Sequence, residues 1–207
     1  MSETLALADA LVSLEPMSRE HAAALVAIGS GARDTYGLTR VPATAEAAAK
    51  YIEDALADRD RGFSVPFVTR DARSGRIVGS TRFMTIERWT WPVARAPESV
   101  SRFADGVEIG STWLAAQAQR TAINTHAKLL MLRHAFEAWR VRRVTLKTDA
   151  RNMRSRNAIE RIGAKLDGVL RAHMPAFDGG VRDTAFYSIV EKEWPTVAAH
   201  LDRLAHR

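Results

Sequence analysis

The sequence predicts a single α/β domain in which helices flank a central twisted, mixed and mostly antiparallel sheet. Its length of 207 residues suits one domain with a full core. An apolar content of 46% with 26% charged residues is typical of a soluble globular protein. Runs with strand-like alternation and runs with helical spacing follow one another without repeats or a linker-like change of composition. We therefore expect one domain over residues 1–207, with residues 196–207 as a short helical tail.

The N-terminal half is expected to form a strand, two helices and a hairpin. In chain order these elements cover residues 10–15, 18–28, 44–60 and 63–86. The segment 29–31, Gly-Ser-Gly, ends the first helix. The second helix has its apolar residues on one face. A polar loop then runs to Gly106, and loops of this length are usually functional or disordered.

The C-terminal half contains the most informative stretch. We expect, in order, a strand, a loop, a helix, a strand, a turn of the form Asn-x-x-Ser and a helix, over residues 107–114, 119–125, 126–139, 141–148, 152–155 and 156–164. A hairpin made of strands 168–173 and 181–190 completes the predicted sheet.

Residues 119–125 lie directly before a helix, and such a junction can bind an anion. Unpaired backbone N–H groups and the positive end of the helix dipole face a ligand there. Arg120 adds a guanidinium that can form two parallel hydrogen bonds with a phosphate. The alternative interpretation is an ordinary helix start with Asn124 or Thr125 as the N-cap.

Residues 108–164 resemble the GCN5-related N-acetyltransferase (GNAT) superfamily, in particular the branch of the ribosomal-protein N-terminal acetyltransferases (RimJ/RimL-like). The resemblance extends over roughly residues 11–194. The acetyl-CoA loop of that family has the form Gln/Arg-x-x-Gly-x-Gly/Ala. The matching residues here are Gln119, Arg120, Thr121, Ala122, Ile123 and Asn124. Ala122 and Asn124 stand where the family has glycines, which adopt a positive φ at the least cost.

The resemblance implies a GNAT-like fold in which two central parallel strands splay apart, with acetyl-CoA as co-substrate and no metal. The pantetheine arm would enter the splay, where a backbone N–H of the first strand would hold the thioester oxygen. The implied cofactor-binding residues are Trp113, Leu114 and Ala115, the loop from Gln119 to Thr125, and Asn152 with Ser155. The implied activity is transfer of an acetyl group to a primary amine, of a protein N-terminus or a small molecule, by direct attack in a ternary complex.

Three residues are candidates for catalysis, because the reaction needs a base for the amine and a proton donor for the departing thiolate. Many family members use a Tyr on the last helix as donor, but Ile159 occupies that position, so the resemblance points to Ser155. Its alternative role is the cap of that helix. Glu108 is a candidate base acting through water, or else a surface or edge carboxylate. His173 is the second candidate base, or else a structural histidine.

The acceptor is expected on the side of the sheet opposite the cofactor, between the N-terminal helices, the hairpin near His173 and the loop with Trp89 and Trp91. Two Trp in one loop offer an apolar wall with polar tips, although they could equally cover the edge of the core. An α-amino group, with a pKa near 8, needs a weaker base than a lysine side chain with a pKa near 10.4. This favours an N-terminal or small amine over lysine.

The charge of the chain leaves a second function class open. The net charge is +6, and residues 116–171 hold 13 Lys and Arg against 4 Asp and Glu. This basic block suits a ligand with several phosphates. The alternative is an inactive GNAT-fold protein that binds RNA or the ribosome, although the block lacks the aromatic stacking pattern of RNA-binding sheets.

Several other classes are excluded or disfavoured by composition. The chain has no Cys, which excludes disulfides, thiol metal sites and a cysteine nucleophile. Residues 1–4 have no basic leader-like character, and no apolar run approaches the roughly 18 residues of a membrane span. We therefore expect a cytoplasmic protein without membrane contact, as a monomer or a homodimer.

Overall fold

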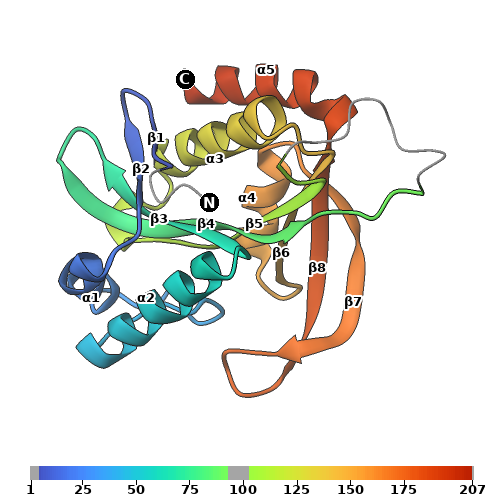
Figure 1. Ribbon diagram of the computed structural model, residues 1–207. Helices are drawn as coiled ribbons and strands as arrows, with labels where there is room; N and C mark the ends of the chain where they lie inside the picture. The colour runs from blue at the N-terminus through green and yellow to red at the C-terminus, as the bar shows by residue number, and fades with distance from the viewer. Residues whose placement is uncertain (1–4, 93–102, 207) are drawn as a thin grey trace.

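The computed structural model describes residues 5–92 and 103–206 and is built on one eight-stranded sheet (Figure 1). The order of the strands is β1-β2-β3-β4-β5-β6-β8-β7. Their bounds are β1 (Leu7–Ala8), β2 (Val12–Pro16), β3 (Ser64–Asp71), β4 (Arg76–Glu87), β5 (Gly106–Leu114), β6 (Arg143–Asp149), β7 (Lys165–Pro175) and β8 (Val181–Val190).

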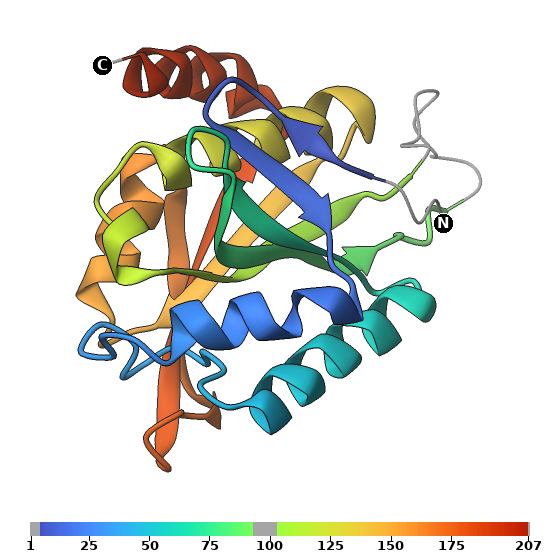
Figure 2. The same ribbon diagram turned by 90° about the vertical axis from the view of Figure 1, so that its left-hand side faces the viewer.

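Helices cover both faces of this sheet. They are α1 (Ala22–Gly29), α2 (Ala45–Asp60), α3 (Ile123–Arg133), α4 (Met153–Arg161) and α5 (Trp194–Ala205). Figure 2 shows α1 and α2 side by side on one face and α3 with α5 on the other. The larger core lies under α3, α4 and α5, and the smaller one lies under α1 and α2 around Leu25, Tyr51 and Trp113. The predicted α/β class with helices flanking a mixed sheet is confirmed.

The boundaries of several elements differ from those predicted. The helix expected over residues 126–139 begins at Ile123 and changes at His134–Ala138 into a π-helical turn. The helix expected over 18–28 opens with a 3₁₀ turn, Arg19–His21. The expected tail is part of α5, which starts at Trp194 because a proline at 195 is compatible with the first turn of a helix. The short strand β1 was missed, since two residues carry no periodicity.

The strands β5 and β6 form the splayed parallel pair that the resemblance implied. Among the described strands all other neighbours are antiparallel. The pairing of β5 with β6 ends after Glu108 and Thr145, although β5 continues to Leu114 and β6 to Asp149. A register shift between β4 and β5 accompanies a φ of +46° at Ser111, which marks a bulge in β5. The C-terminal halves of the two strands therefore diverge and open the sheet.

Lys128 of α3 points into the interior beneath β5. Its Nζ donates to Oγ1 of Thr112 at 2.6 Å and to Oγ1 of Thr81 at 3.3 Å. Its side chain makes no ion pair with a described residue, and burial lowers its pKa from 10.5 to about 7. This lysine of the basic block 116–171 is therefore a core residue.

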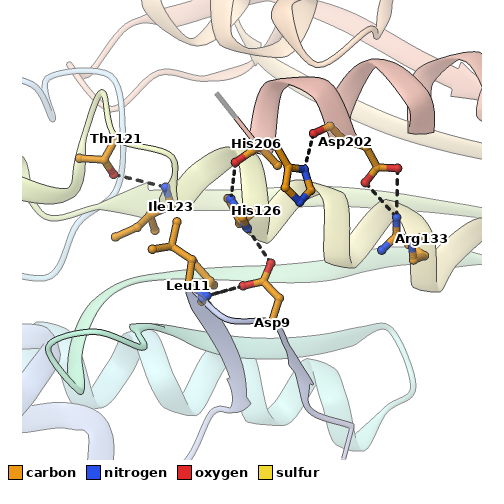
Figure 3. Close-up of polar contacts among 10 residues, drawn as sticks. Asp9, Leu11, Thr121, Ile123, His126, Arg133, Asp202 and His206 are labelled. Carbon is orange, nitrogen blue, oxygen red and sulfur yellow. Dashed lines mark hydrogen bonds and ion pairs between the residues drawn. The ribbon is translucent and has the colours of Figure 1, made fainter.

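His126, one turn into α3, contacts residues near both ends of the described chain. Its Nδ1 lies 2.7 Å from Oδ2 of Asp9, in the turn between β1 and β2, and its Nε2 lies 3.1 Å from the carbonyl oxygen of Ala205 in α5 (Figure 3). Arg133 adds an ion pair with Asp202 of α5 at 3.1 Å. The helix α3 is thus held by the N-terminal hairpin and by α5. No helix in the described ranges combines the length and the apolar character needed to cross a bilayer.

Candidate active site

The loop before α3 has the geometry of an anion site. A 3₁₀ turn, Ala116–Ala118, leads to Arg120, which is exposed and has a φ of +60°, and α3 starts after Ala122. Within the described residues no acceptor binds the N–H groups of Asn124 and Thr125, so they remain free for a ligand. The alternative in which Asn124 or Thr125 is the N-cap is wrong, because both lie inside the helix.

The two replacements of glycine in this loop cost no backbone strain. Ala122 has a φ of −69°, and the left-handed position of the loop is Arg120 instead. Thr121 stabilises the turn, since its hydroxyl donates to the carbonyl of Ala118 at 2.7 Å. The altered motif therefore still forms a loop that leads directly into a helix.

At the end of β5, one of the three predicted backbone N–H groups is free to bind a ligand in the splay, and the other two point toward β4. The N–H of Ala115 donates to the carbonyl of Val78, so the strand ladder uses it. Because successive N–H groups of a strand point to opposite edges, that of Leu114 points toward β6 and into the splay. The N–H of Trp113, two residues before Ala115, points toward β4 like that of Ala115. Of the three predicted residues, Leu114 can therefore offer its N–H.

Tyr36 is a residue at the splay that the sequence analysis missed. Its hydroxyl donates to the carbonyl of Leu114 at 2.8 Å, beside Nε2 of Gln119, which donates to the same oxygen at 2.9 Å. Burial raises the pKa of Tyr36, so this phenol keeps its proton at neutral pH and can serve as a donor. Tyr36 lies in an irregular segment, where no periodicity indicates which side chains point inward.

The turn between β6 and α4 places Ser155 beside the same opening. Oδ1 of Asn152 accepts a hydrogen bond from the backbone N–H of Ser155 at 3.1 Å, so Asn152 is the N-cap of α4. The alternative in which Ser155 caps this helix is wrong, and its half-buried hydroxyl forms no hydrogen bond with a described residue. Arg154 reaches from α4 to Gln119 at 3.4 Å and to the carbonyl of Thr35. Ile159 is buried in the larger core and offers no proton.

Glu108 is a buried carboxylate in the centre of the sheet. It is 5% exposed, so the alternative of a surface carboxylate is wrong. Its Oε2 lies 2.9 Å from Nζ of Lys147 on β6 and accepts from Oγ1 of Thr85 at 3.4 Å. Gly110 makes room for the carboxylate, since a Cβ there would lie 2.9 Å from its Oε1. Lys147, like Tyr36, is a residue of the site that the sequence did not indicate.

The structure does not bring His173 and the Trp pair together. His173 lies 3.1 Å from Oγ1 of Thr184, which pairs with Asp149 at the end of β6. The rings of Trp89 and Trp91 lie 5.8 Å apart, and Trp91 stacks on Arg142 just before β6 begins. Because strands rise about 3.3 Å per residue, the length of β6 separates the two places by roughly 20 Å.

Glu108 lies between these two places along the sheet. Lys147 and the ring of Phe186 stand between Glu108 and His173, and His173 packs edge-on against that ring. The two candidate bases therefore do not face one position, and Glu108 is the one beside the splay.

Of the 13 Lys and Arg in the predicted basic block, six make ion pairs with described carboxylates and seven do not. The six are Arg133, Arg142, Arg143, Lys147, Arg151 and Lys165. Arg120, Arg154 and Arg161 make no ion pair within the described residues, and all three lie at the loop, at the start of α4 or against Thr125 of α3. The positive charge without an ion pair is thus only partly gathered beside this loop, since Lys128, Arg140, Arg156 and Arg171 also make no ion pair with a described residue. Among the described residues no group of three or more His, Cys, Asp or Glu is arranged to hold a metal ion.

Comparison with known proteins agrees with this geometry. A family model described as acetyltransferase (GNAT) domain matches residues 12–165. No curated protein has a matching sequence. The structure is similar to a GCN5-related N-acetyltransferase from Brucella melitensis, with a TM-score of 0.81, 25% identity and coverage of 99% of this chain and 86% of that one.

Two further solved structures share the fold at lower identity. Mycobacterium smegmatis RimJ, solved with CoA-disulfide, has a TM-score of 0.76 and 22% identity, with 99% of this chain and 94% of that chain covered. The microcin C7 self-immunity acetyltransferase MccE, solved with acetyl-CoA and AMP, has a TM-score of 0.71 and 20% identity, with 88% and 93% covered.

Proposed function

Because the chain belongs to the GNAT acetyltransferase family, we propose that it is an acetyl-CoA-dependent N-acetyltransferase that acts on a primary amine. The observation that carries this proposal is the splay between β5 and β6, which opens beside the loop-to-helix anion site. The proposal includes a cytoplasmic location and a monomeric or dimeric state, both of which rest on the sequence. The direct test is release of CoA from acetyl-CoA with a panel of amines, where wild-type protein without activity on any amine contradicts the proposal.

The residues of the opening fit the parts of acetyl-CoA. The loop N–H groups and Arg120 suit the pyrophosphate, and the N–H of Leu114 suits a carbonyl oxygen at the end of β5. Asn152 orders the turn that carries Ser155. Acetyl-CoA supplies the thioester carbonyl that an amine attacks.

The side chains around the splay divide the proton transfers between them. We assign Glu108 to accept a proton from the acceptor ammonium, directly or through water, so that the nitrogen carries a free electron pair. The hydroxyl of Ser155 would give a proton to the sulfur as the carbon–sulfur bond breaks and would take up the proton that the attacking nitrogen loses as the amide forms. Tyr36 is another hydroxyl beside the opening. The products are an amide and a CoA thiol. His173 stays a weaker proposal, because Phe186 and Lys147 lie between it and Glu108.

Removal of the charge of Arg120 tests the phosphate site. Arg120→Asn should weaken binding of acetyl-CoA by about tenfold, because an exposed charge-assisted hydrogen bond contributes on the order of 1.5 kcal/mol. Asn tolerates the left-handed backbone at this position. Titration calorimetry with acetyl-CoA measures the effect.

Arg140→Asn is the matched control, since Arg140 is also exposed and has a φ of +57° but follows the other end of α3. Equal loss of affinity in both variants would place the phosphates elsewhere.

The Trp pair is proposed as a wall of the acceptor site at the Glu108 end of the sheet. Replacing Trp89 and Trp91 together with Ala should raise the Michaelis constant for the amine severalfold, because stacked rings contribute on the order of 1 kcal/mol. The constant for acetyl-CoA should stay the same. Phe63→Ala, at another exposed aromatic residue, is the control. A change confined to the acetyl-CoA constant would show that the pair lies on the cofactor side.

A further inference from the structure

Arg82 of β4 is a buried cation for which the described residues supply no anion. It is 7% exposed, and its Nε is buried without a hydrogen-bond partner. No described carboxylate or carbonyl accepts from its guanidinium, which lies 5.0 Å from the centre of the Tyr51 ring in α2. A buried charge without a partner is costly, and an anion that entered beside it would remove that cost.

Arg82 and Glu108 share the face of the sheet that α1 and α2 partly cover. Arg82 pairs with Gly110 and Met84 pairs with Glu108 across β4 and β5. A Cβ at Gly110 would meet both Sδ of Met84 and Oε1 of Glu108, so these groups point to one face. Arg82 lies two residues before Met84 and contacts α2, which puts it on that face too. The position directly opposite Arg82 is Gly110, which presents no side chain.

The buried charges on this face do not balance without a ligand. Glu87, which pairs with Gly106 on the same face, is exposed and accepts from Nε1 of Trp89 at 3.2 Å. Lys147 lies 2.9 Å from Glu108 and neutralises its carboxylate. Arg82 then leaves one positive charge in excess, next to the residue that we assign as the base. Residues that are diagonal across two strands have Cβ atoms about 7–8 Å apart. An amine at Glu108 and an anion at Arg82 would therefore belong to one small molecule or one terminal residue.

We propose that Arg82 binds a carboxylate of the acceptor, so that the substrate is an amine with a carboxylate a few bonds from its nitrogen. This inference rests on the proposed acetyltransferase function. Its chemistry is shared by two sources, a free amino acid and a peptide whose N-terminal residue is acidic. Arg82 selects for either of them through a charge-assisted, two-bond contact between guanidinium and carboxylate.

The first experiment compares matched acceptors in the wild type and in Arg82→Met. The pairs are amino acids against their carboxamides, and peptides starting with Asp against the same peptides starting with Asn. The wild type should prefer the anionic member of one pair in kcat/KM, and the variant should lose roughly 10- to 100-fold of that preference. The Michaelis constant for acetyl-CoA should not change. Arg76→Met is the matched control, because Arg76 is an exposed arginine on the same strand.

The second experiment does not depend on turnover. Thermal unfolding is followed with CoA and each acceptor pair present. The anionic member should stabilise the wild type more than its neutral partner, and Arg82→Met should remove the difference while raising the melting temperature of the ligand-free protein. A purely structural arginine would lower that temperature instead.

The outcomes separate this inference from the proposed function. Acetylation of amines without preference for the anionic member, or a preference that survives Arg82→Met, overturns the role of Arg82 alone. A wild type that acetylates no amine overturns the proposed function. If no anionic acceptor then stabilises the protein more than its neutral partner, the carboxylate site is overturned as well.

Discussion

At pH 7, replacement of Lys128 by Met is expected to raise the free energy of unfolding by about 2–4 kcal/mol, since each unit of pKa shift corresponds to about 1.4 kcal/mol. Burial lowers the pKa of Lys128 from 10.5 to about 7, and its hydrogen-bond partners within the described residues are the hydroxyls of Thr112 and Thr81. Met keeps most of the volume of the side chain and carries no charge. The two Thr hydroxyls, 2.8 Å apart, can still bond each other.

The lowered pKa of Lys128 determines how the free energy of unfolding depends on pH. Between about pH 7 and 10.5 the unfolded chain holds a proton on Lys128 that the folded protein has lost. Lys128 therefore costs the most stability below about pH 7, and the cost falls as the pH rises toward 10.5.

Chemical denaturation of the wild type and Lys128→Met at several pH values measures the difference between them. The gap should be widest near pH 7 and should close toward pH 10. Lys192→Met, at an exposed lysine, is the control and should change little. A constant gap across this range would mean that Lys128 titrates normally in the folded protein.

Ser155→Ala is expected to lower kcat by roughly 10²-fold, the usual contribution of general acid catalysis. The hydroxyl of Ser155 has no structural bond with a described residue to lose, and the N-cap of α4 is Asn152. The variant should therefore keep its stability and its affinity for acetyl-CoA. Steady-state kinetics together with calorimetry of acetyl-CoA binding test both statements.

Tyr36→Phe is the informative comparison for this prediction. Tyr36 is another hydroxyl at the opening, and it donates to the carbonyl of Leu114. If Ser155→Ala turns over like the wild type while Tyr36→Phe loses about 10²-fold, the proton donor is the phenol. Loss of acetyl-CoA affinity with unchanged kcat in Tyr36→Phe would instead limit Tyr36 to holding the end of β5.

Much of the fold, including the loop that leads into α3, could be predicted because the signals are local. Alternation and helical spacing located most strands and helices, and Asn152-x-x-Ser155 lies at a helix start as expected. The loop before α3 was predicted for the same reason, since a helix start needs only neighbouring residues. The exact start of α3 was missed, because Ala122 is an N-cap without a side-chain acceptor.

The parts of the site that could not be predicted depend on contacts between distant segments. Arg82 and Lys128 look like ordinary basic residues, and only the packing of α2 and α3 on the sheet makes them buried. The contact of Tyr36 with Leu114 joins residues 78 positions apart. The grouping of His173 with the Trp pair failed because a sequence does not show at which end of β6 each hairpin meets the sheet.

The contact of His126 with Asp9 and Ala205 has a consequence for the order in which the molecule folds. It joins residues that are 117 and 79 positions apart in the chain. Closing such long loops costs chain entropy, so these hydrogen bonds should form late in folding and break early in unfolding. A chain that is still being synthesised cannot form the contact with Ala205 until that residue has left the ribosome. The N-terminal part of α3 should therefore be fully held only after the segment up to Ala205 has emerged.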